Sequence, residues 1–279
     1  MLALTYEAIV DLALAEDLSS GDVTTDACIP PDARAVAHAV ARSPMVACGG
    51  PVFAHVFAKI DPQIAFESHV SEGAGVEWGT RLWTVRGRAR SILMGERIAL
   101  NFVQRMSGIA TLARAYVDKL PQGSRARITD TRKTTPGLRA IERYAVRIGG
   151  AHNHRDNLGS AVLIKDNHIV AAGSISAAID RARALAPHTT KIECEVDTLA
   201  QLDQALAAGA DVVLLDNMDD ATITEAVART KGRAVLEASG SVTLERVESL
   251  ARTGVDAISV GALTHSAPAA DIGVDFDTR

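Results

Sequence analysis

The sequence predicts an α/β protein whose C-terminal part folds as an incomplete parallel α/β barrel. From about residue 126, short apolar runs alternate with helical patterns, as in chains of βαβ units. The runs are apolar throughout, which is typical of parallel strands covered on both faces. Polar residues stand at the C-terminal ends of these runs, and parallel α/β barrels place their active sites at that end.

Fewer strands are expected than a complete barrel has. About six candidate strands follow residue 125 instead of the usual eight, so we expect an incomplete or irregular barrel, with an open doubly wound sheet as the alternative. No Gly-x-Gly-x-x-Gly follows an early strand, which disfavours a dinucleotide-binding fold. We expect strands at 126–130, 161–165, 191–195, 211–216, 233–237 and 256–260, and helices at 137–148, 174–185, 198–208, 219–230 and 243–253.

Residues 1–100 have a different pattern. A helix is expected near residues 5–17, and strict alternation of apolar and polar residues in 34–40 and 64–70 predicts half-exposed antiparallel strands. Residues 91–120 form a long amphipathic helical stretch, which we expect to join the two regions and to be interrupted near Ser107-Gly108. In the barrel region, Thr198 and Gln201 have capping-box spacing.

Composition limits the class of protein. The chain has 279 residues and a net charge of −5, and 47% of its residues are hydrophobic. No apolar run reaches the length of a membrane span, and residues 1–7 lack the order of a signal peptide, so we expect a cytoplasmic location. Cys28, Cys48 and Cys194 are dispersed, which favours reduced thiols over a disulfide framework or a zinc site.

Charge is concentrated in one segment. Residues 125–168 hold nine basic and four acidic residues, or +5, which leaves 20 basic and 30 acidic residues, or −10, elsewhere. A basic pocket in an acidic protein attracts small anions and not nucleic acid. Three of these cations repeat at helical spacing and are read as a solvated helix face. Four of the remaining six stand at expected element ends and predict an anion pocket: Arg132, Lys133, Arg155 and Lys165.

An ordered set of motifs, spread over nearly the whole chain, resembles the quinolinate phosphoribosyltransferase family, also called nicotinate-nucleotide pyrophosphorylase (carboxylating). Any one of the motifs is weak, but the ordered set is highly specific. The set comprises Glu16-Asp17-Leu18, Gly21-Asp22-Val23-Thr24-Thr25, Gly95-Glu96-Arg97, Ser107-Gly108-Ile109-Ala110-Thr111, the segment Asp130–Gly137, Asn153-His154-Arg155, Leu163-Ile164-Lys165-Asp166-Asn167-His168, Glu193-Cys194-Glu195-Val196-Asp197, Leu215-Asp216-Asn217, Glu237-Ala238-Ser239-Gly240 and Val260-Gly261-Ala262-Leu263-Thr264-His265.

The resemblance implies an enzyme that uses Mg²⁺ to join quinolinate to phosphoribosyl pyrophosphate, with release of pyrophosphate and CO₂, in NAD synthesis. It also implies a homodimer with shared active sites, an N-terminal α/β sandwich domain and a short α/β barrel. Accordingly, we expect an N-terminal domain at 1–105, a barrel at 106–265 and a C-terminal segment at 266–279 that returns to the first domain. We expect no nucleic acid and no membrane as partner.

The same resemblance assigns residues to roles. Quinolinate carboxylates are expected to bind to Arg132, Arg155 and Lys165, with Thr131 and His154 beside them, and Arg97 is expected to reach into the partner subunit's site. Glu195 and Asp216 are expected to lie beside the ribose and hold the metal, and with Lys133, near the pyrophosphate, they form the expected catalytic set. The 5′-phosphate is expected at Ser239, Gly240, Ser241, Val260, Gly261 and Ala262.

Elementary chemistry agrees with these roles. Arginine binds carboxylates in a bidentate way, and quinolinate has two adjacent carboxylates. Departure of pyrophosphate leaves positive charge on the ribose, which Glu195 and Asp216 would stabilise. Mg²⁺ prefers oxygen ligands and takes few of them from protein. Ser239-Gly240-Ser241 offers backbone N–H groups to a phosphate at an expected strand-to-helix turn. His152 and His154 predict no metal site, because no third ligand has suitable spacing.

The sequence departs from the family pattern after Arg155. Where the family usually has a Gly-Leu step and then an acid, Asn157 and Ser160 stand here. Asn tolerates a left-handed backbone, so little effect is expected from the first change. The second is expected to remove a contact that orients a basic residue, which leaves room for an altered substrate.

Three other functions are open at this point. One is the molybdenum-transport-linked paralogue of the family, which acts on another substrate. Another is a Schiff-base aldolase that uses Lys165 or Lys133 as nucleophile. The third is a phosphosugar-binding barrel without catalysis, against which the acids at the strand ends argue, because acids repel a phosphate unless a metal or a cationic transition state is present.

Overall fold

The computed structural model describes residues 6–277 and divides the chain into two compact units. The first unit combines the chain up to Arg114 with Thr134–Gly150 and the chain from Leu263 onward, whereas the second combines Ala115–Lys133 with Ala151–Ala262. This division differs from the expected boundaries, because the chain leaves the barrel after its first strand and re-enters it at Ala151. The α/β class, with a parallel sheet and a separate antiparallel sheet, is confirmed.

The first unit contains a four-stranded antiparallel sheet in the order β12-β1-β5-β3, together with the small β2-β4 pair. The helix expected at 5–17 runs from Glu7 to Leu18, and Thr5 lies outside the described residues. The elements of this unit are α1 (Glu7–Leu18), α2 (Val23–Cys28), β1 (Arg34–Ala41), β2 (Met45–Val46), α3 (Gly50–Ile60), β3 (Ala65–Ser68), β4 (Gly75–Val76), β5 (Arg81–Arg88), most of α4 (Ala89–Val117), α5 (Arg139–Ile148), nearly all of α11 (Ala262–His265) and β12 (Ile272–Phe276).

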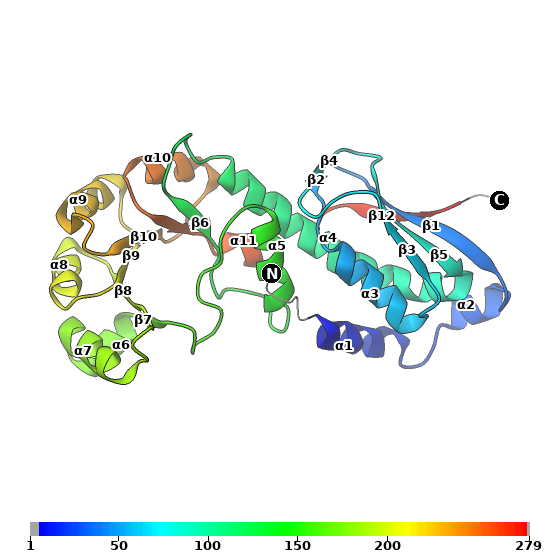
Figure 1. Cartoon of the computed structure of the whole chain (residues 1–279), viewed down its shortest axis with the longest axis horizontal. Coiled ribbons are helices and arrows are strands. Elements are labelled where there is room, and N and C mark those ends of the chain that lie inside the picture. The colour runs from blue at the N-terminus through cyan, green and yellow to red at the C-terminus, as the bar shows by residue number, and fades with distance from the viewer. Residues whose placement is uncertain (1–5, 278–279) are drawn as a thin grey trace. The chain divides into compact units, whose positions relative to one another are not determined.

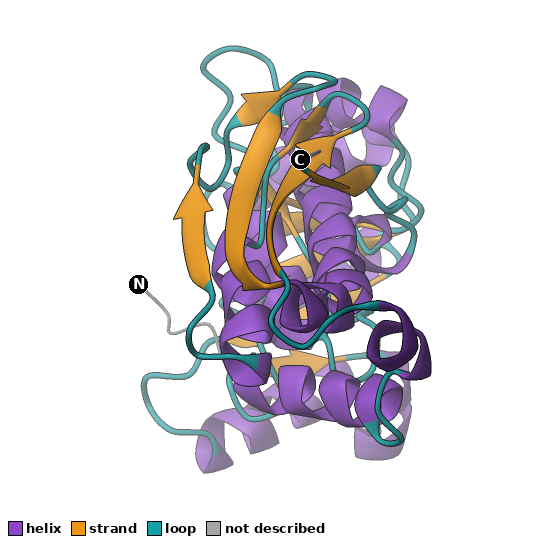
Figure 2. Cartoon of the chain, turned by 90° about the vertical axis from the view of Figure 1, so that its right-hand side faces the viewer, coloured by secondary structure: helices purple, strands orange, loops and turns teal. Residues whose placement is uncertain are grey.

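Helices lie beside this sheet (Figure 2), and α3 packs against it through large apolar side chains. Phe53 of α3 lies 5.2 Å, between ring centroids, from Trp83 of β5, and 5.0 Å from Phe57. Gly95 of α4 approaches Phe57 so closely that a Cβ there would lie 2.8 Å from its ring. Such burial of aromatic rings between a helix and a sheet is a major source of stability.

The long helix α4 runs without a break, so the interruption expected near Ser107-Gly108 was wrong. Glycine is present there because another part of the chain comes close to the helix. A Cβ at position 108 would lie only 2.0 Å from the backbone oxygen of Pro268, in the segment between α11 and β12. The sequence pattern identified the glycine, but the reason for it is a contact with a residue far along the chain.

Gly108→Ala is therefore expected to destabilise the protein by about 1–3 kcal/mol or more, because the added methyl group forces the Pro268 backbone or α4 to move. The measurement is the free energy of unfolding in urea. Gly75→Ala is the matched control, since nothing lies within 4 Å of a Cβ at position 75. Equal stability of the two variants would show that the close approach at position 108 is not present in solution.

The second unit is a six-stranded parallel sheet in the order β6-β11-β10-β9-β8-β7. Helices α8, α9 and α10 cover the outer side of its strands (Figure 1). The elements are β6 (Arg127–Thr129), β7 (Val162–Ile164), α6 (Asp166–Ala172), α7 (Ile175–Leu185), β8 (Ile192–Val196), α8 (Leu199–Ala207), β9 (Val212–Asp216), α9 (Asp220–Thr230), β10 (Val235–Ser239), the 3₁₀ turn η1 (Leu244–Arg246), α10 (Val247–Arg252) and β11 (Ala257–Ser259).

The strand order is that of a barrel that does not close. Each strand from β7 to β10 pairs with the next one along the chain, and β11 pairs with β6, the first strand of this sheet. Among the six strands of this sheet, β6 and β7 are consecutive but do not pair. A doubly wound sheet, in which the strand order reverses at a central switch point, is thereby excluded.

Most of the expected elements are present within a few residues of their predicted ends. Thr198 caps α8 as expected, since its Oγ1 accepts a hydrogen bond from the N–H of Gln201 at 3.2 Å. Two expectations need correction. The helix expected at 137–148 groups with the first unit and not with the barrel, and the helix expected at 243–253 begins as a 3₁₀ turn before α10.

One edge of the open barrel is extended by a short bridge. His152 pairs in parallel with Thr129: its N–H donates to Ile128 O at 2.8 Å, and its carbonyl accepts from Asp130 N at 3.0 Å. This bridge holds the residues that follow His152 beside the C-terminal end of β6.

Across residues 6–277, no helix is both long enough and apolar enough to cross a membrane. The three cysteines are free thiols.

Candidate active site

The expected site residues, with the exception of Arg97, belong to the second unit. They stand at or just beyond the C-terminal ends of the strands, where a parallel barrel gathers side chains from different strands. Thr131, Arg132 and Lys133 follow β6, and Lys165 follows β7. Glu195, Asp216 and Ser239 lie at the ends of β8, β9 and β10, and Val260-Gly261-Ala262 follow β11.

Two of the expected carboxylate-binding arginines stand on segments that are joined by a hydrogen bond, because Asp130, two residues before Arg132, accepts from the backbone N–H of His154, the residue before Arg155. Burial lowers the pKa of the Arg155 guanidinium, and the positive charge of Arg132 lowers it further. Arg155 also donates from Nη1 to the carbonyl of Ala161 at 3.1 Å, which fixes the direction of its side chain. Two neighbouring guanidinium groups repel each other, so this arrangement is favourable when an anion lies between them.

Lys165 and Glu195 form an ion pair at the ends of neighbouring strands. Lys165 Nζ lies 2.5 Å from Glu195 Oε2, and the Glu195 side chain is 15% exposed. The pair places a cation and a carboxylate side by side at the rim of the barrel.

Glu195 and Asp216 offer carboxylates from adjacent strands on one face of the sheet. Glu195 is in register with Leu214, and Asp216 lies two residues beyond Leu214, so both carboxylates project from the same side. Asn217 donates from Nδ2 to Asp216 Oδ2 at 2.7 Å and thereby orients that carboxylate. Asn217 has a left-handed backbone with φ 53°, a conformation that asparagine tolerates better than most residues. The two acids therefore fit a cation that takes oxygen ligands.

The loop after β10 has an unusual backbone. Gly240 has φ 99° and Ser241 has φ 44°. A Cβ at position 240 would lie 2.2 Å from Asn217 Oδ1, so only glycine fits beside the end of β9. The expected strand-to-helix turn needs correction, because the three-residue η1 follows this loop in place of a regular helix start. An attraction from a helix dipole is therefore weaker here than the sequence predicted.

A buried carboxylate organises the residues around His154. Asp130 is fully buried, and its two oxygens accept hydrogen bonds from Asn153 Nδ2 at 2.6 Å and from the backbone N–H of His154 at 2.7 Å. This contact joins the end of β6 to the segment that follows the His152 bridge. It was not expected from the sequence.

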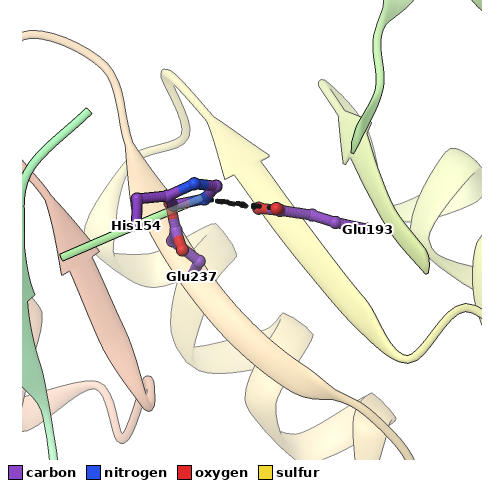
Figure 3. Close-up of side chains that lie close together, drawn as sticks. All are labelled: His154, Glu193 and Glu237. Carbon is purple, nitrogen blue, oxygen red and sulfur yellow. Dashed lines mark hydrogen bonds and ion pairs between the residues drawn. The ribbon is translucent and has the colours of Figure 1, made fainter. Parts of the chain in front are cut away.

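Glu193 and Glu237 are further polar residues that the sequence reasoning did not place in the site. Nε2 of His154 lies 3.2 Å from Glu193 Oε2 and 3.5 Å from Glu237 Oε1 (Figure 3). Both glutamates are only 5% exposed. A signal was available in the sequence, because Glu193 and Glu195 are two residues apart and therefore share a face of β8.

The charges of Glu193 and Glu237 affect the pKa of His154, and those of His154 and Glu237 affect the pKa of Glu193. Burial lowers the pKa of His154, but hydrogen bonds and charges from Glu193 and Glu237 outweigh burial and raise that pKa to about 10. Burial raises the pKa of Glu193, while its hydrogen bond with His154 lowers it. Among the described residues, this cluster is also the group of three whose donor atoms lie close enough to hold a metal ion.

The two residues that depart from the family pattern form a local turn. Ser160 Oγ accepts from the backbone N–H of Asp156 at 3.0 Å and of Asn157 at 3.2 Å. Ser160 therefore closes its own loop. The backbone φ of Asn157 is not positive. The left-handed conformation that asparagine tolerates is therefore not adopted at this position.

Arg97 lies in the first unit and borders a cavity of about 240 Å³ there. Asn101 and Arg105, one and two turns further along α4, line the same cavity. Arg105 is paired with the fully buried Glu142 at 2.7 Å, whereas Arg97 is the cation expected to act on substrate.

Two family models together match most of the chain. The model of the quinolinate phosphoribosyl transferase N-terminal domain matches residues 22–107, and that of the C-terminal domain matches residues 109–275. The nicotinate-nucleotide pyrophosphorylase (carboxylating) of Mycobacterium leprae (strain TN) is 45% identical over 270 residues, which cover 95% of this chain and 94% of the relative. A probable enzyme of the same name from Bacillus subtilis (strain 168) is 42% identical over 260 residues, which cover 93% and 89%.

Solved structures also align with nearly the whole chain. The nicotinate-nucleotide pyrophosphorylase from Ehrlichia chaffeensis aligns with a TM-score of 0.94 and 39% identity, over 99% of this chain and 100% of that one. NadC from Streptococcus pyogenes aligns with a TM-score of 0.94 and 38% identity, over 100% and 99%.

Proposed function

Because the chain belongs to the quinolinate phosphoribosyl transferase family, we propose that it transfers phosphoribosyl from phosphoribosyl pyrophosphate to quinolinate with loss of CO₂. The products are nicotinate mononucleotide and pyrophosphate, and the reaction belongs to de novo NAD synthesis in the cytoplasm. The observation that carries this proposal is the set of cations at one end of the barrel: Arg132 and Arg155 stand on segments that Asp130 joins, and Lys165 pairs with Glu195 at the ends of neighbouring strands.

The cations bind and orient the acceptor. Arg132 and Arg155 suit the two adjacent carboxylates of quinolinate, since each guanidinium can bind a carboxylate through two N–H groups. A dianion bound there relieves the repulsion between the two arginines. Lys165 adds a third positive charge from β7, and its ion pair with Glu195 joins the acceptor side of the site to the ribose side.

The acids act on the ribose. When pyrophosphate departs from the anomeric carbon, positive charge develops on the ring, and Glu195 and Asp216 lie on the face where they stabilise that charge. Lys133 balances the charge of the departing pyrophosphate. The ring nitrogen of quinolinate forms the new bond to the anomeric carbon as the bond to pyrophosphate breaks.

The bound quinolinate then loses its neighbouring carboxylate. Alkylation makes the ring nitrogen cationic, so the electron pair left by departing CO₂ is stabilised by the ring, and a proton replaces the carboxylate. No further cofactor is needed for this step. Magnesium supplies charge neutralisation for the pyrophosphate oxygens, and Glu195 and Asp216 would hold it, because carboxylate oxygens are its preferred protein ligands.

The active unit is proposed to be a homodimer with shared sites, to which Arg97 of one subunit contributes a cation for the other. Lys165 is less suited to the aldolase alternative. A Schiff-base lysine acts as a neutral amine, whereas Lys165 serves here as the cation of an ion pair with Glu195.

The proposal predicts that quinolinate is converted and nicotinate is not. Nicotinate has one carboxylate, so in a site built for two carboxylates some of the binding cations would have no partner. The measurement is formation of nicotinate mononucleotide from each acid with phosphoribosyl pyrophosphate and Mg²⁺. Chelation of Mg²⁺ should abolish turnover, and re-addition should restore it. Equal turnover of the two acids would refute the assignment, and failure of both would favour the paralogue with another substrate.

A further inference from the structure

The His154 cluster contains two buried glutamates to which the proposed chemistry gives no task. Glu193 on β8 and Glu237 on β10 lie on strands separated by β9, and their carboxylates meet at Nε2 of His154 (Figure 3). Two buried carboxylates beneath a pocket for an anion oppose ligand binding by their charge. Their presence therefore calls for a function that outweighs this cost.

The hydrogen bonds of His154 indicate which ring nitrogen carries the proton. The backbone N–H of Arg155 donates to Nδ1 of His154 at 2.7 Å, so Nδ1 accepts and carries no proton. In a neutral ring the proton is then on Nε2, where it is donated to Glu193, while Glu237 Oε1 lies 3.5 Å from the same nitrogen. Two observations oppose each other here: the carboxylates raise the pKa of His154, whereas a second proton would have to occupy Nδ1, which already accepts the hydrogen bond from the Arg155 N–H. The hydrogen-bond geometry at Nδ1 decides in favour of the neutral ring.

This tautomer argues against a metal in the cluster. A histidine binds a metal through the lone pair of a ring nitrogen, and Nε2, the nitrogen that faces the two glutamates, has its lone pair replaced by a proton. The close approach of the three groups is therefore explained by hydrogen bonding.

The cluster fixes the backbone that presents Arg155. The backbone N–H of His154 donates to Asp130, its Nε2–H donates to Glu193, and its Nδ1 accepts from the N–H of Arg155. Glu237 adds a second negative charge 3.5 Å from Nε2. A fixed backbone matters here because the charge of Arg132 disfavours the charged form of Arg155, while the charge of Glu193 favours it. Together with the hydrogen bond from Arg155 Nη1 to the carbonyl of Ala161, the fixed backbone keeps the guanidinium in a geometry that suits adjacent carboxylates.

We propose that Glu193 and Glu237 are positioning residues, which act through His154 to hold Arg155 beside Arg132 for binding of the dicarboxylate substrate. This inference rests on the proposed function for the identity of the substrate. Neither glutamate needs to touch the substrate in this account.

Glu193→Gln and Glu237→Gln test the proposal through the direction of the change in KM. Loss of positioning is expected to raise the KM for quinolinate by roughly tenfold or more, as expected for a charge-assisted hydrogen bond. The KM for phosphoribosyl pyrophosphate is expected to stay within about twofold, because that substrate is read at other strand ends. If the glutamates acted by charge alone, removal of a negative charge near a dianion would lower the KM for quinolinate, and this would overturn the proposal.

Glu248→Gln is the matched control, since Glu248 is exposed and pairs with Arg252 on α10; its kinetics should equal those of the unmodified protein. Thermal unfolding of every variant separates a local effect from loss of the fold. An equal rise of both KM values would indicate a general structural defect and would also count against positioning.

A second measurement needs no substrate. In ¹⁵N NMR of the histidine-labelled protein, with His154→Asn to assign the signal, the ring of His154 is expected to be protonated at Nε2 and not at Nδ1. Protonation at Nδ1, alone or together with Nε2, would overturn the proposal regardless of activity. If the unmodified protein shows the expected tautomer but does not convert quinolinate, the proposed function fails, and the failure is distinct from that of the cluster.

Discussion

Arg97→Ala and Lys133→Ala are each expected to be nearly inactive alone, and to recover about a quarter of the original activity when the two variants are mixed and allowed to reassociate. Each variant loses a cation that is expected to pair with a charge of the bound substrates, and loss of one partner of such a desolvated pair costs about 2–5 kcal/mol, enough to silence each variant. In a mixed dimer with shared sites, one site combines the intact Lys133 of one chain with the intact Arg97 of the other, while the second site lacks both. Random reassociation makes about half of the dimers mixed.

The measurement is activity after unfolding and joint refolding of the two variants. A mixture of Lys133→Ala with Glu195→Ala is the control: both residues belong to the second unit of the same chain, so no mixed dimer contains an intact site. Recovery in the first mixture and not in the second supports shared sites. If Arg97 served its own chain, the first mixture would remain as inactive as the second.

Glu195→Ala and Asp216→Ala are expected to lower kcat much more than they raise KM, because these acids act on charge that develops in the transition state. The loss for one such group is typically roughly 2.7–4 kcal/mol, or about 10²–10³ in kcat. Asp216 gives the cleaner result, since its carboxylate accepts a hydrogen bond from the neutral Asn217, whereas removal of Glu195 also takes the carboxylate away from Lys165.

Steady-state kinetics of both variants provide the check. Asp203→Ala is a suitable control, because Asp203 is an exposed residue of α8 that pairs with Arg229. If both active-site variants kept their kcat and changed only KM, the acids would be binding groups and the assigned roles would be wrong.

The sequence predicted the parallel barrel region well because its signals are local. Short apolar runs, capping residues such as Thr198, and glycines with left-handed backbone such as Gly209 and Gly254 mark element ends within a few residues. The polar residues at the strand ends could be named for the same reason, since parallel strands bring their C-terminal ends to one rim.

The missed features depend on contacts between distant parts of the chain. Gly108 resembles a helix breaker in the sequence, and only the nearby Pro268 backbone shows why α4 needs a glycine there. The helix α5 has the pattern of a barrel helix, yet its buried Glu142 pairs with Arg105 of α4, and the helix belongs to the first unit.

The His154 cluster was missed for a related reason. Its two glutamates stand 39 and 83 positions after the histidine, and no local sequence pattern predicts that the three side chains lie close together. Glu193 could have been suspected from its alternation with Glu195. Glu237 stands near a strand end, among the polar residues that the sequence pattern singles out, but its contact with His154 follows only from the strand order.

The central claim is that phosphoribosyl transfer to quinolinate is accompanied by loss of the carboxylate next to the ring nitrogen. The most direct measurement uses quinolinate labelled at that carboxylate, together with phosphoribosyl pyrophosphate and Mg²⁺. We expect labelled CO₂, pyrophosphate and nicotinate mononucleotide to form in equal amounts. Pyrophosphate release that leaves the label in the nucleotide, or no phosphoribosyl transfer to quinolinate at all, would contradict the assignment.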